Sequence, residues 1–238
     1  MKKMVMPILA AGALVLLAAC GGSGDPGAVL TQADFAAKVR AAMQAKGSFR
    51  SVAVNIDAEG VTRFTTDVKL SGARADVSGT TSDDGEVSSV VRVGGELYAR
   101  DKALSTDPAK PWVKFDPKGT TLNATLIQLL ATRTETYELI GGAAYATSFS
   151  SAPAGESTVY SMTIDLPKAT AAKALGDYIS AGMVAELKLH EVPVRATVGK
   201  DMLLTKLEFE LDGTKVVADF GNYGAPVTIA VPGPAEIL

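Results

Sequence analysis

Long stretches in which apolar and polar residues alternate most constrain the fold of this chain, because a period of two indicates strands with one buried face. The alternation begins at Ser48, and turn sequences that contain glycine separate its segments. A shift of one residue in the pairing would turn every side chain to the opposite face, so the turns should fix the register. The pattern predicts a large antiparallel sheet with one apolar and one polar face.

The last predicted hairpin has the best-defined register. Asp212-Gly213 is typical of a two-residue type I′ turn, which sets two apolar pairs on the inner face and two opposite-charge pairs on the outer face. These pairs are Leu207 with Ala218, Phe209 with Val216, Glu210 with Lys215, and Lys206 with Asp219. Further strands are expected at Val192 to Val198 and at Val227 to Val231, whereas more than one loop length fits the connection from Val198 to Leu203.

Two earlier hairpins are predicted with three-residue loops. The first loop, Ala58-Glu59-Gly60, places two groups of apolar residues together on the inner face. The second, Asp83-Asp84-Gly85, sets Asp76 opposite Arg92 on the outer face. The inner groups of the first hairpin are Val52, Val54 and Ile56 with Phe64, Val68 and Leu70, and the second hairpin pairs Ala75 with Val93 and Val77 with Val91. Shorter strands are expected around Leu97, from Trp112 to Phe115, Tyr137 to Ile140, Ala146 to Ser150, and Thr158 to Leu166.

Three helices interrupt the strand pattern. The first runs from Gln32 to Lys46, with a capping-box spacing at Thr31 and a stop at Gly47. The others are predicted from Thr121 to Thr132 and from Pro167 to Ala181. Their apolar faces are Phe35, Val39 and Met43; Leu122, Leu126, Leu129 and Leu130; and Ala171, Leu175, Tyr178 and Ile179. The expected fold is α+β: a large curved antiparallel sheet, forming a half-open, incomplete barrel, whose concave face is covered by a few helices.

The N-terminus has the pattern of a bacterial lipoprotein signal. Lys2 and Lys3 precede an apolar run that is too short to span a bilayer comfortably, and small residues lead directly to Cys20, the only cysteine. We expect residues 1–19 to be removed and Cys20 to be acylated; an ordinary secretory signal before a chance cysteine is the alternative. Residues 20–30 then form a flexible leash, and residues 31–238 form a single domain. Two or more acyl chains would anchor the protein stably, facing outward from the membrane.

Composition and motifs exclude several function classes. Without Lys2 and Lys3 the 23 basic residues fall to 21 against 26 acidic residues, a net charge of −5 that argues against a nucleic-acid partner. A single cysteine and a single histidine, His190, give no set of zinc ligands, and His190 is expected at the surface or at a strand edge. No serine lies in a G-x-S-x-G elbow. We therefore expect no catalytic residues, no metal and no cofactor.

Several segments together resemble the LppX/LprG-type lipoproteins of the bacterial envelope. They are the lipobox, the FAAKVRAAM helix, VRVGGELYAR, PWVKFDP, YELIGGAAYATSF, YSMTIDLPKA and YGAPVTIAVP. The resemblance implies a half-barrel sheet folded over helices, similar in shape to the LolA lipoprotein carriers. It also implies a hydrophobic cavity that takes an acylated lipid or glycolipid, a location on the outer leaflet of the cell membrane, and an envelope transporter as a partner.

Three functions remain open from the sequence. A lipid-binding protein is favoured by the resemblance and by an interior poor in aromatic residues, which could leave the concave face under-filled. An accessory protein with a fully packed core and no lipid is the alternative, and a hydrolase is third because no catalytic base is evident. If a cavity exists, the residues expected to line it are Val52, Val54, Ile56, Phe64, Val68, Leu126, Leu130, Leu207 and Phe209.

Overall fold

The computed structural model describes residues 29–70, 75–83, 86–115, 131 and 133–238. Its strands form one antiparallel sheet in the order β6-β5-β4-β3-β2-β1-β11-β10-β9-β8-β7, so the sheet is not closed. The strands are β1 Ser48–Ile56, β2 Val61–Lys69, β3 Asp76–Asp83, β4 Glu86–Val93, β5 Glu96–Arg100, β6 Trp112–Lys114, β7 Ala146–Ala154, β8 Ser157–Asp165, β9 Glu191–Gly199, β10 Leu204–Leu211 and β11 Thr214–Gly221.

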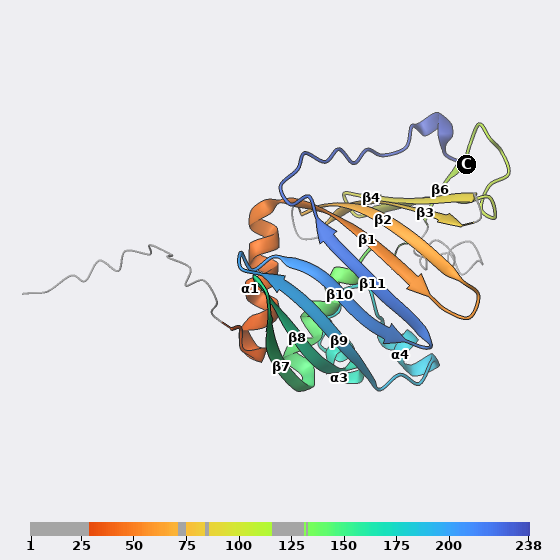
Figure 1. The fold of residues 1–238 in the computed structure, drawn as a ribbon. Helices are drawn as coiled ribbons and strands as arrows, with labels where there is room; N and C mark the ends of the chain where they lie inside the picture. Colours follow the sequence, from red (N-terminus) through yellow and green to blue (C-terminus); the bar gives the residue numbers. More distant parts are fainter. Residues whose placement is uncertain (1–28, 71–74, 84–85, 116–130, 132) are drawn as a thin grey trace, which may run out of the picture.

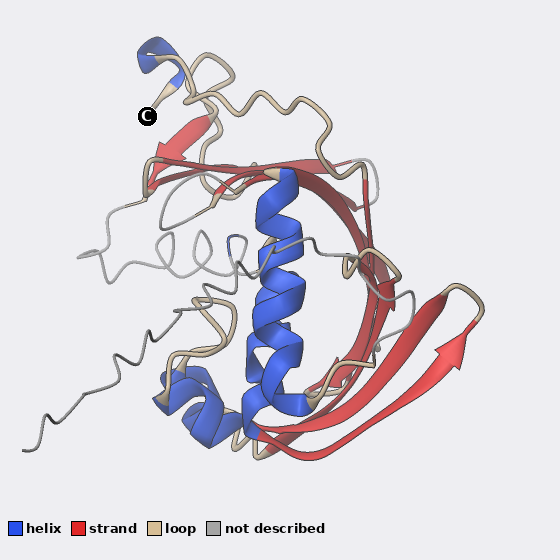
Figure 2. Cartoon of the chain, turned by 90° about the vertical axis from the view of Figure 1, so that its left-hand side faces the viewer, coloured by secondary structure: helices blue, strands red, loops and turns tan. Residues whose placement is uncertain are grey.

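The helices lie on the concave side of this sheet, as the sequence predicts. They are α1 Gln32–Lys46, the 3-10 helix η1 Thr136–Tyr145, α3 Leu166–Ala171, α4 Ala181–Glu186 and the short 3-10 helix η2 Pro234–Glu236, which instead lies near the C-terminus. Pairing of β1 with β11 joins two meanders, and the strands fan out on either side of this pair (Figure 1). Figure 2 shows α1 running across the open side of the curved sheet.

Helix α1 has the predicted bounds. Thr31 Oγ1 accepts a hydrogen bond from the Asp34 N–H at 3.3 Å, and Gly47 ends the helix with a φ of 75°. Phe35, Val39 and Met43 are buried and face the sheet side of the core. The spacing of these three residues therefore decides which face of α1 packs inward.

The predicted register of the last hairpin is confirmed. All four predicted residue pairs across β10 and β11 are present, and Asp212 and Gly213 have φ values of 49° and 76°, as a type I′ turn requires. The alternate residues Val192 to Val198 on β9 are buried as expected. A bulge between Leu204 and Lys206 shifts the β9–β10 register, and this irregularity explains why the sequence alone left that connection open.

The predicted inner face of β1 is wrong. Ile56 pairs with Val61, so the connection contains four residues, and the Asp57 carboxylate accepts hydrogen bonds from the Glu59 and Gly60 N–H groups. Asp57 is therefore part of the turn instead of the strand. Phe49, Ser51 and Ala53 are the buried, inward residues, whereas Val52 and Val54 are half-buried on the opposite face and Ile56 is exposed. On β2, Phe64 and Val68 face inward as predicted.

The predicted pairing of β3 with β4 is also wrong by one residue. Asp83 is opposite Glu86, which leaves only residues 84 and 85 between the strands, and Val77 is opposite Arg92. Arg92 therefore faces the interior and is 3% exposed. Its Nε donates to the Ala75 carbonyl at 3.2 Å, and its guanidinium forms a buried ion pair with Glu135.

Residues 137–140 form no strand and belong to η1. Most of η1 is buried, and α1, α3 and β8 pack against it. A side chain at Gly142 would place its Cβ 2.7 Å from the Ile164 side chain, and one at Gly141 would overlap the Ala174 carbonyl. These glycines therefore permit close packing of η1 instead of marking the end of a strand.

Two other predicted elements differ. The helix expected from Pro167 to Ala181 ends at Ala171, because Lys173 and Gly176 have φ values of 54° and 56°. Ala171 is exposed, contrary to the prediction, whereas Leu175, Tyr178 and Ile179 are buried as expected. The segment from Val227 to Val231 is not a strand, although Val227 and Ile229 are half-buried. The predicted helix 121–132 lies almost wholly outside the described residues, as do the signal and leash up to residue 28.

Candidate functional site

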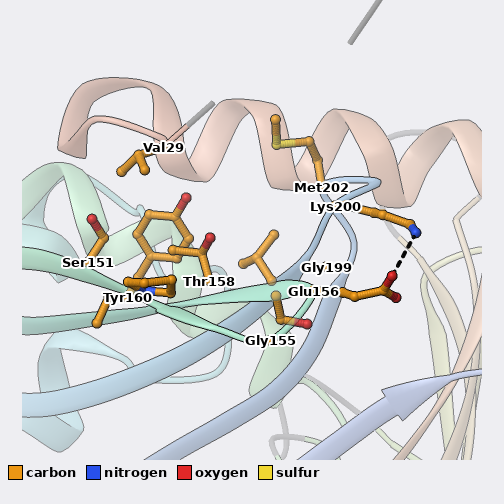
Figure 3. Close-up of a pocket in the computed structure, with 13 residues that line it drawn as sticks. Val29, Ser151, Gly155, Glu156, Thr158, Tyr160, Gly199, Lys200 and Met202 are labelled. Carbon is orange, nitrogen blue, oxygen red and sulfur yellow. Dashed lines mark hydrogen bonds and ion pairs between the residues drawn. The ribbon is translucent and has the colours of Figure 1, made fainter. Parts of the chain in front are cut away.

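A groove lies between Val29, which precedes α1, and the ends of β7, β8 and β9 (Figure 3). We call it the N-terminal groove. Its volume is about 500 Å³, and most of the surface that lines it is apolar. The lining residues are Val29, Ser151, Ala152, Pro153, Gly155, Glu156, Ser157, Thr158, Tyr160, Val198, Gly199, Lys200 and Met202. Figure 3 shows α1 running over the strands that carry these side chains.

Tyr160 connects this groove to the core. The Leu30 N–H donates a hydrogen bond to Tyr160 Oη at 2.9 Å, so the phenol fixes the position where the chain enters the domain. The Tyr160 ring lies 4.9 Å from the Phe35 ring and 5.8 Å from the Phe149 ring. Aromatic contacts of this kind are short and directional, and they form a rigid inner boundary for the groove.

The outer rim of the groove is polar. Lys200 Nζ lies 3.4 Å from Glu156 Oε1, and the two side chains are 65% and 85% exposed (Figure 3). An ion pair with this exposure contributes little to stability because water and salt screen it. The groove thus combines an apolar lining with a charged, solvent-exposed rim, which suits a ligand that has an apolar part and a polar end.

The residues predicted to line a cavity are not in this groove. Phe64, Val68, Leu207 and Phe209 do face the concave side, but they are buried in the core. Phe209 packs edge-on against Tyr178 at 6.0 Å, and the Arg133 guanidinium lies 5.1 Å from the Phe64 ring centre. Val52, Val54 and Ile56 are on the other face of β1, as described above. Leu126, Leu130 and Cys20 lie outside the described residues.

The groove residues carry no strong sequence signal. The segment from Ser151 to Ser157 consists mainly of small and polar residues, which indicate no more than a hairpin. Lys200 to Met202 belong to the connection whose length the sequence left open. Val198 and Tyr160 were predicted as inward residues, and the structure confirms that they are buried. What the sequence could not indicate is that Val29 and α1 lie above these two side chains.

A second, polar cleft lies near the other end of α1, with a volume of about 560 Å³. Arg40 Nη2 forms an ion pair with Glu138 Oε2 at 2.6 Å and also donates to the Ala174 carbonyl at 3.3 Å. Burial raises the pKa of Glu138 above its usual value, and the Arg40 charge opposes that rise. Together with the buried ion pair of Arg92 and Glu135, these contacts hold α1, β4, η1 and the segment between α3 and α4 together. The sequence did not indicate this role for the charged residues.

The single histidine lies outside both clefts. His190 is exposed at the start of β9, as predicted, and its carbonyl accepts a hydrogen bond from the Leu166 N–H at 2.9 Å. Among the described residues, no group of three or more His, Cys, Asp or Glu side chains could hold a metal ion. Over the same ranges, none of the helices is both long enough and apolar enough to cross a bilayer.

Comparison with known proteins shows a shared fold at low sequence identity. No family model and no curated protein matches the chain. The crystal structure of LprF from Mycobacterium bovis is 15% identical, covers 84% of this chain and 97% of its own, and gives a TM-score of 0.49. The lipoprotein LppX from Mycobacterium tuberculosis is 14% identical, covers 84% of this chain and 100% of its own, and gives a TM-score of 0.50. The expected resemblance to LppX is therefore confirmed at the level of the fold.

Proposed function

With the fold of the lipoprotein LppX as the premise, we propose that this chain is an envelope lipoprotein of the LppX/LprG type that binds an acylated lipid or glycolipid. The cargo would be carried or presented in the cell envelope without any catalytic step. The observation that supports this proposal most directly is the N-terminal groove, which is largely apolar and opens between α1 and the edge of a half-open sheet.

The chemistry of the groove suits an acyl chain. Small-molecule sites have volumes of roughly 300–1,000 Å³ and are lined mainly by apolar groups, and the groove has about 500 Å³. A hydrocarbon chain needs no hydrogen-bond partner, so it can lie along Val29, Val198 and Met202 without leaving a buried polar group unpaired. A polar headgroup would remain at the rim beside Glu156 and Lys200.

The proposed anchor precedes the groove residue Val29 in the chain. An acylated Cys20 would hold the protein on the outer leaflet of the cell membrane, and the nine residue steps to Val29 span at most ~30 Å when fully extended. Val29 itself lines the groove. A tether of this length would keep the groove mouth close to the lipid surface, where cargo enters or leaves.

Filling the groove tests the binding proposal. Ser151 is exposed on the groove wall, so Ser151→Trp should occupy the groove without overpacking the core. Ser161→Trp is the matched control, because Ser161 is an exposed serine on the neighbouring strand and does not line the groove. We expect the chain from residue 21 onward to bind a fluorescent fatty acid and to carry lipid in native mass spectrometry. Ser151→Trp should lose both signals, and Ser161→Trp should retain them.

The outcomes of that experiment separate the two candidate functions. Equal binding by the two folded variants would place the lipid elsewhere. A wild-type protein purified from its native host without lipid, and unable to take up the probe, would contradict the lipid-binding proposal itself.

The anchor has its own test. Cys20→Ser should remove the lipid mass and leave the precursor uncleaved by the lipoprotein peptidase, measured by labelled fatty acid incorporation and by intact mass. Incorporation at the normal level in the Cys20→Ser protein would show that Cys20 is not the acylation site.

The packing of the concave face favours one alternative function. Val68 and Leu207, at the centre of the inner face, are fully buried beneath the helices in the described part of the chain. A filled core of this kind fits an accessory protein that binds an envelope partner through the polar face of its sheet. Cross-linking that recovers a stable protein partner, together with a lipid-free native mass, would favour this function.

A further inference from the structure

The two edges of the sheet differ strongly. β6 has three residues, and its Trp112 already forms a bridge with Ile237 and accepts a hydrogen bond from the Leu238 N–H at 2.8 Å. β7 has nine residues and is the last strand of the sheet, with β8 as its neighbour on one side. Seven of the nine β7 residues are exposed. Among the described residues no strand pairs with the other side of β7, and apart from the Ala146 carbonyl, which accepts a hydrogen bond from Gln32 Nε2, the backbone groups there are available for pairing with another strand.

β7 lacks the usual protection of an edge strand along its middle. Its sequence, ATSFSSAPA, contains no charged residue, whereas exposed edges commonly carry lysine or another charge that prevents edge-to-edge association. The strand is irregular only near its ends, where a bulge lies between Ala146 and Ser148 and a proline stands at position 153. Residues 148–152 form an uninterrupted, uncharged window.

Pro153 indicates which backbone groups of this window point outward. Proline has no N–H, so its place opposite Thr158 fits a position where no hydrogen bond is made to β8. Backbone direction alternates along a strand, so Phe149 and Ser151 share this outward orientation. Each of these two residues presents one N–H donor and one carbonyl acceptor to the free side of the sheet.

We propose that two copies of this chain pair through β7, antiparallel, about a two-fold axis at Ser150. Phe149 of one copy then lies opposite Ser151 of the second copy, and the reverse pair completes four backbone hydrogen bonds. A two-fold interface uses the same patch twice, so any charge near its axis would face its own copy. The uncharged window meets this condition, and pairing would also cover the half-buried Phe149 ring.

This interface is small, and its strength should depend on concentration. Stable interfaces bury roughly 1,200–2,000 Å², and one short strand pair provides less. The dimer is therefore reversible in dilute solution and favoured where molecules are held together on a membrane surface. The pairing is argued from the backbone of β7 and does not require bound lipid, although Ser151, Ala152 and Pro153 of β7 also line the N-terminal groove.

Disulfide trapping of the full-length chain tests this pairing. Opposite residues at a non-hydrogen-bonded position have Cα atoms ~4.5 Å apart, which lies within the range that a disulfide can bridge. Ser150→Cys should therefore give a covalent dimer under mild oxidation. Ser161→Cys is the matched control, since Ser161 is exposed opposite Ser150 on β8 and would lie three strand spacings, about 14 Å, from its counterpart. Both variants also carry Cys20, so any disulfide formed by a Cys20 thiol that escaped acylation would be the same in both.

A second measurement uses no cysteine chemistry. In sedimentation of the full-length protein in detergent, wild type should show a concentration-dependent dimer. Ser150→Lys, which places two like charges at the axis, should weaken it about fivefold without changing the melting temperature. Equal trapping of Ser150→Cys and Ser161→Cys would overturn the proposal. So would a wild type that is monomeric at every concentration, or cross-linking of Ser150→Cys to a different protein in place of a second copy.

Discussion

At the scale of single residues, Gly141 and Gly142 allow η1 to pack very closely against its neighbours. Any side chain at these positions would overlap the Ala174 carbonyl, the Ile164 side chain or the Leu175 side chain. The absence of side chains at these glycines therefore sets the distance at which η1 approaches the α3–α4 connection and β8. A backbone carbonyl cannot move aside as a side chain can, which makes Gly141 the more sensitive of the two.

Gly141→Ala should destabilise the fold by ~1–3 kcal/mol or more, because the added methyl group overpacks a site bounded by backbone. Gly182→Ala is the control within α4, where the nearest atom to the new Cβ is Ser180 Oγ at 3.7 Å. Gly182 is in the first turn of α4, so this substitution should be neutral or stabilise the protein by up to ~1 kcal/mol, since alanine favours a helix more than glycine does. Urea denaturation of both variants measures the two effects, and equal effects would contradict the packing argument.

Asp165 provides a pH-dependent contribution at the start of α3. The Lys168 ammonium group lies 2.7 Å from its carboxylate and the Lys168 N–H donates at 3.0 Å, and these contacts hold the pKa of Asp165 below its ordinary value of 3.8. A lowered pKa means that the stabilisation is fully present above pH ~4 and is lost as the pH falls through the folded-state pKa. Asp165→Asn keeps a good helix cap but removes the charge.

The melting temperature of Asp165→Asn should therefore lie below that of wild type at pH 7, and the difference should shrink towards zero as the pH is lowered below 3.8. Thermal unfolding followed by circular dichroism across this range measures the difference. A difference that stays constant with pH would show that the carboxylate charge is not the cause.

At the scale of elements, turn residues decide which strand faces are buried. The β10–β11 register followed directly from Asp212-Gly213, because a two-residue type I′ turn leaves only one pairing. At β1–β2 the apolar residues Val52, Val54 and Ile56 alternate as regularly as true inner residues do, and only the Asp57 contacts with the turn amides distinguish the two faces. Hydrophobic alternation alone could not settle this register, because both faces of β1 carry apolar residues.

Exchanging two charges tests the β10–β11 pairing. Glu210→Lys alone sets like charges opposite each other and should cost a few tenths of a kcal/mol up to ~1 kcal/mol. The double variant Glu210→Lys/Lys215→Glu restores opposite charges and should be nearly neutral. Chemical denaturation at low salt measures both free energies of unfolding, and a double variant that is less stable than the single one would contradict the pairing.

The sequence predicts the candidate site less well than the fold. Strand and helix patterns depend on neighbours along the chain, whereas the N-terminal groove depends on Val29 lying beside the β7–β8 hairpin, more than 100 positions away. Arg92 shows the same limit. The alternation of apolar and polar residues along β4 suggested that the Arg92 side chain is exposed. Only the ion pair with Glu135, which is distant in the sequence, explains why this charged residue is buried.

At the scale of the whole molecule, one helix divides the concave side. Val29, just before α1, borders the N-terminal groove, whereas Arg40 and Gln44 of α1 border the polar cleft. The core between these sites is continuous and includes residues of α1, η1 and the inner faces of strands on both sides of the β1–β11 pair. The two sites are therefore connected by a continuous, closely packed interior.

The occupied β6 edge limits how far such sheets could grow. If both edges were open, β7 of one molecule could add to β6 of the next, and this head-to-tail pairing would continue into a fibre. Ile237 and Leu238 already pair with Trp112 at the β6 edge, so association through β7 as proposed would end after two molecules. Deletion of residues 232–238 should therefore allow slow fibre formation at high concentration. Rising thioflavin fluorescence and filaments in electron microscopy would reveal the fibres, and the intact chain should show neither.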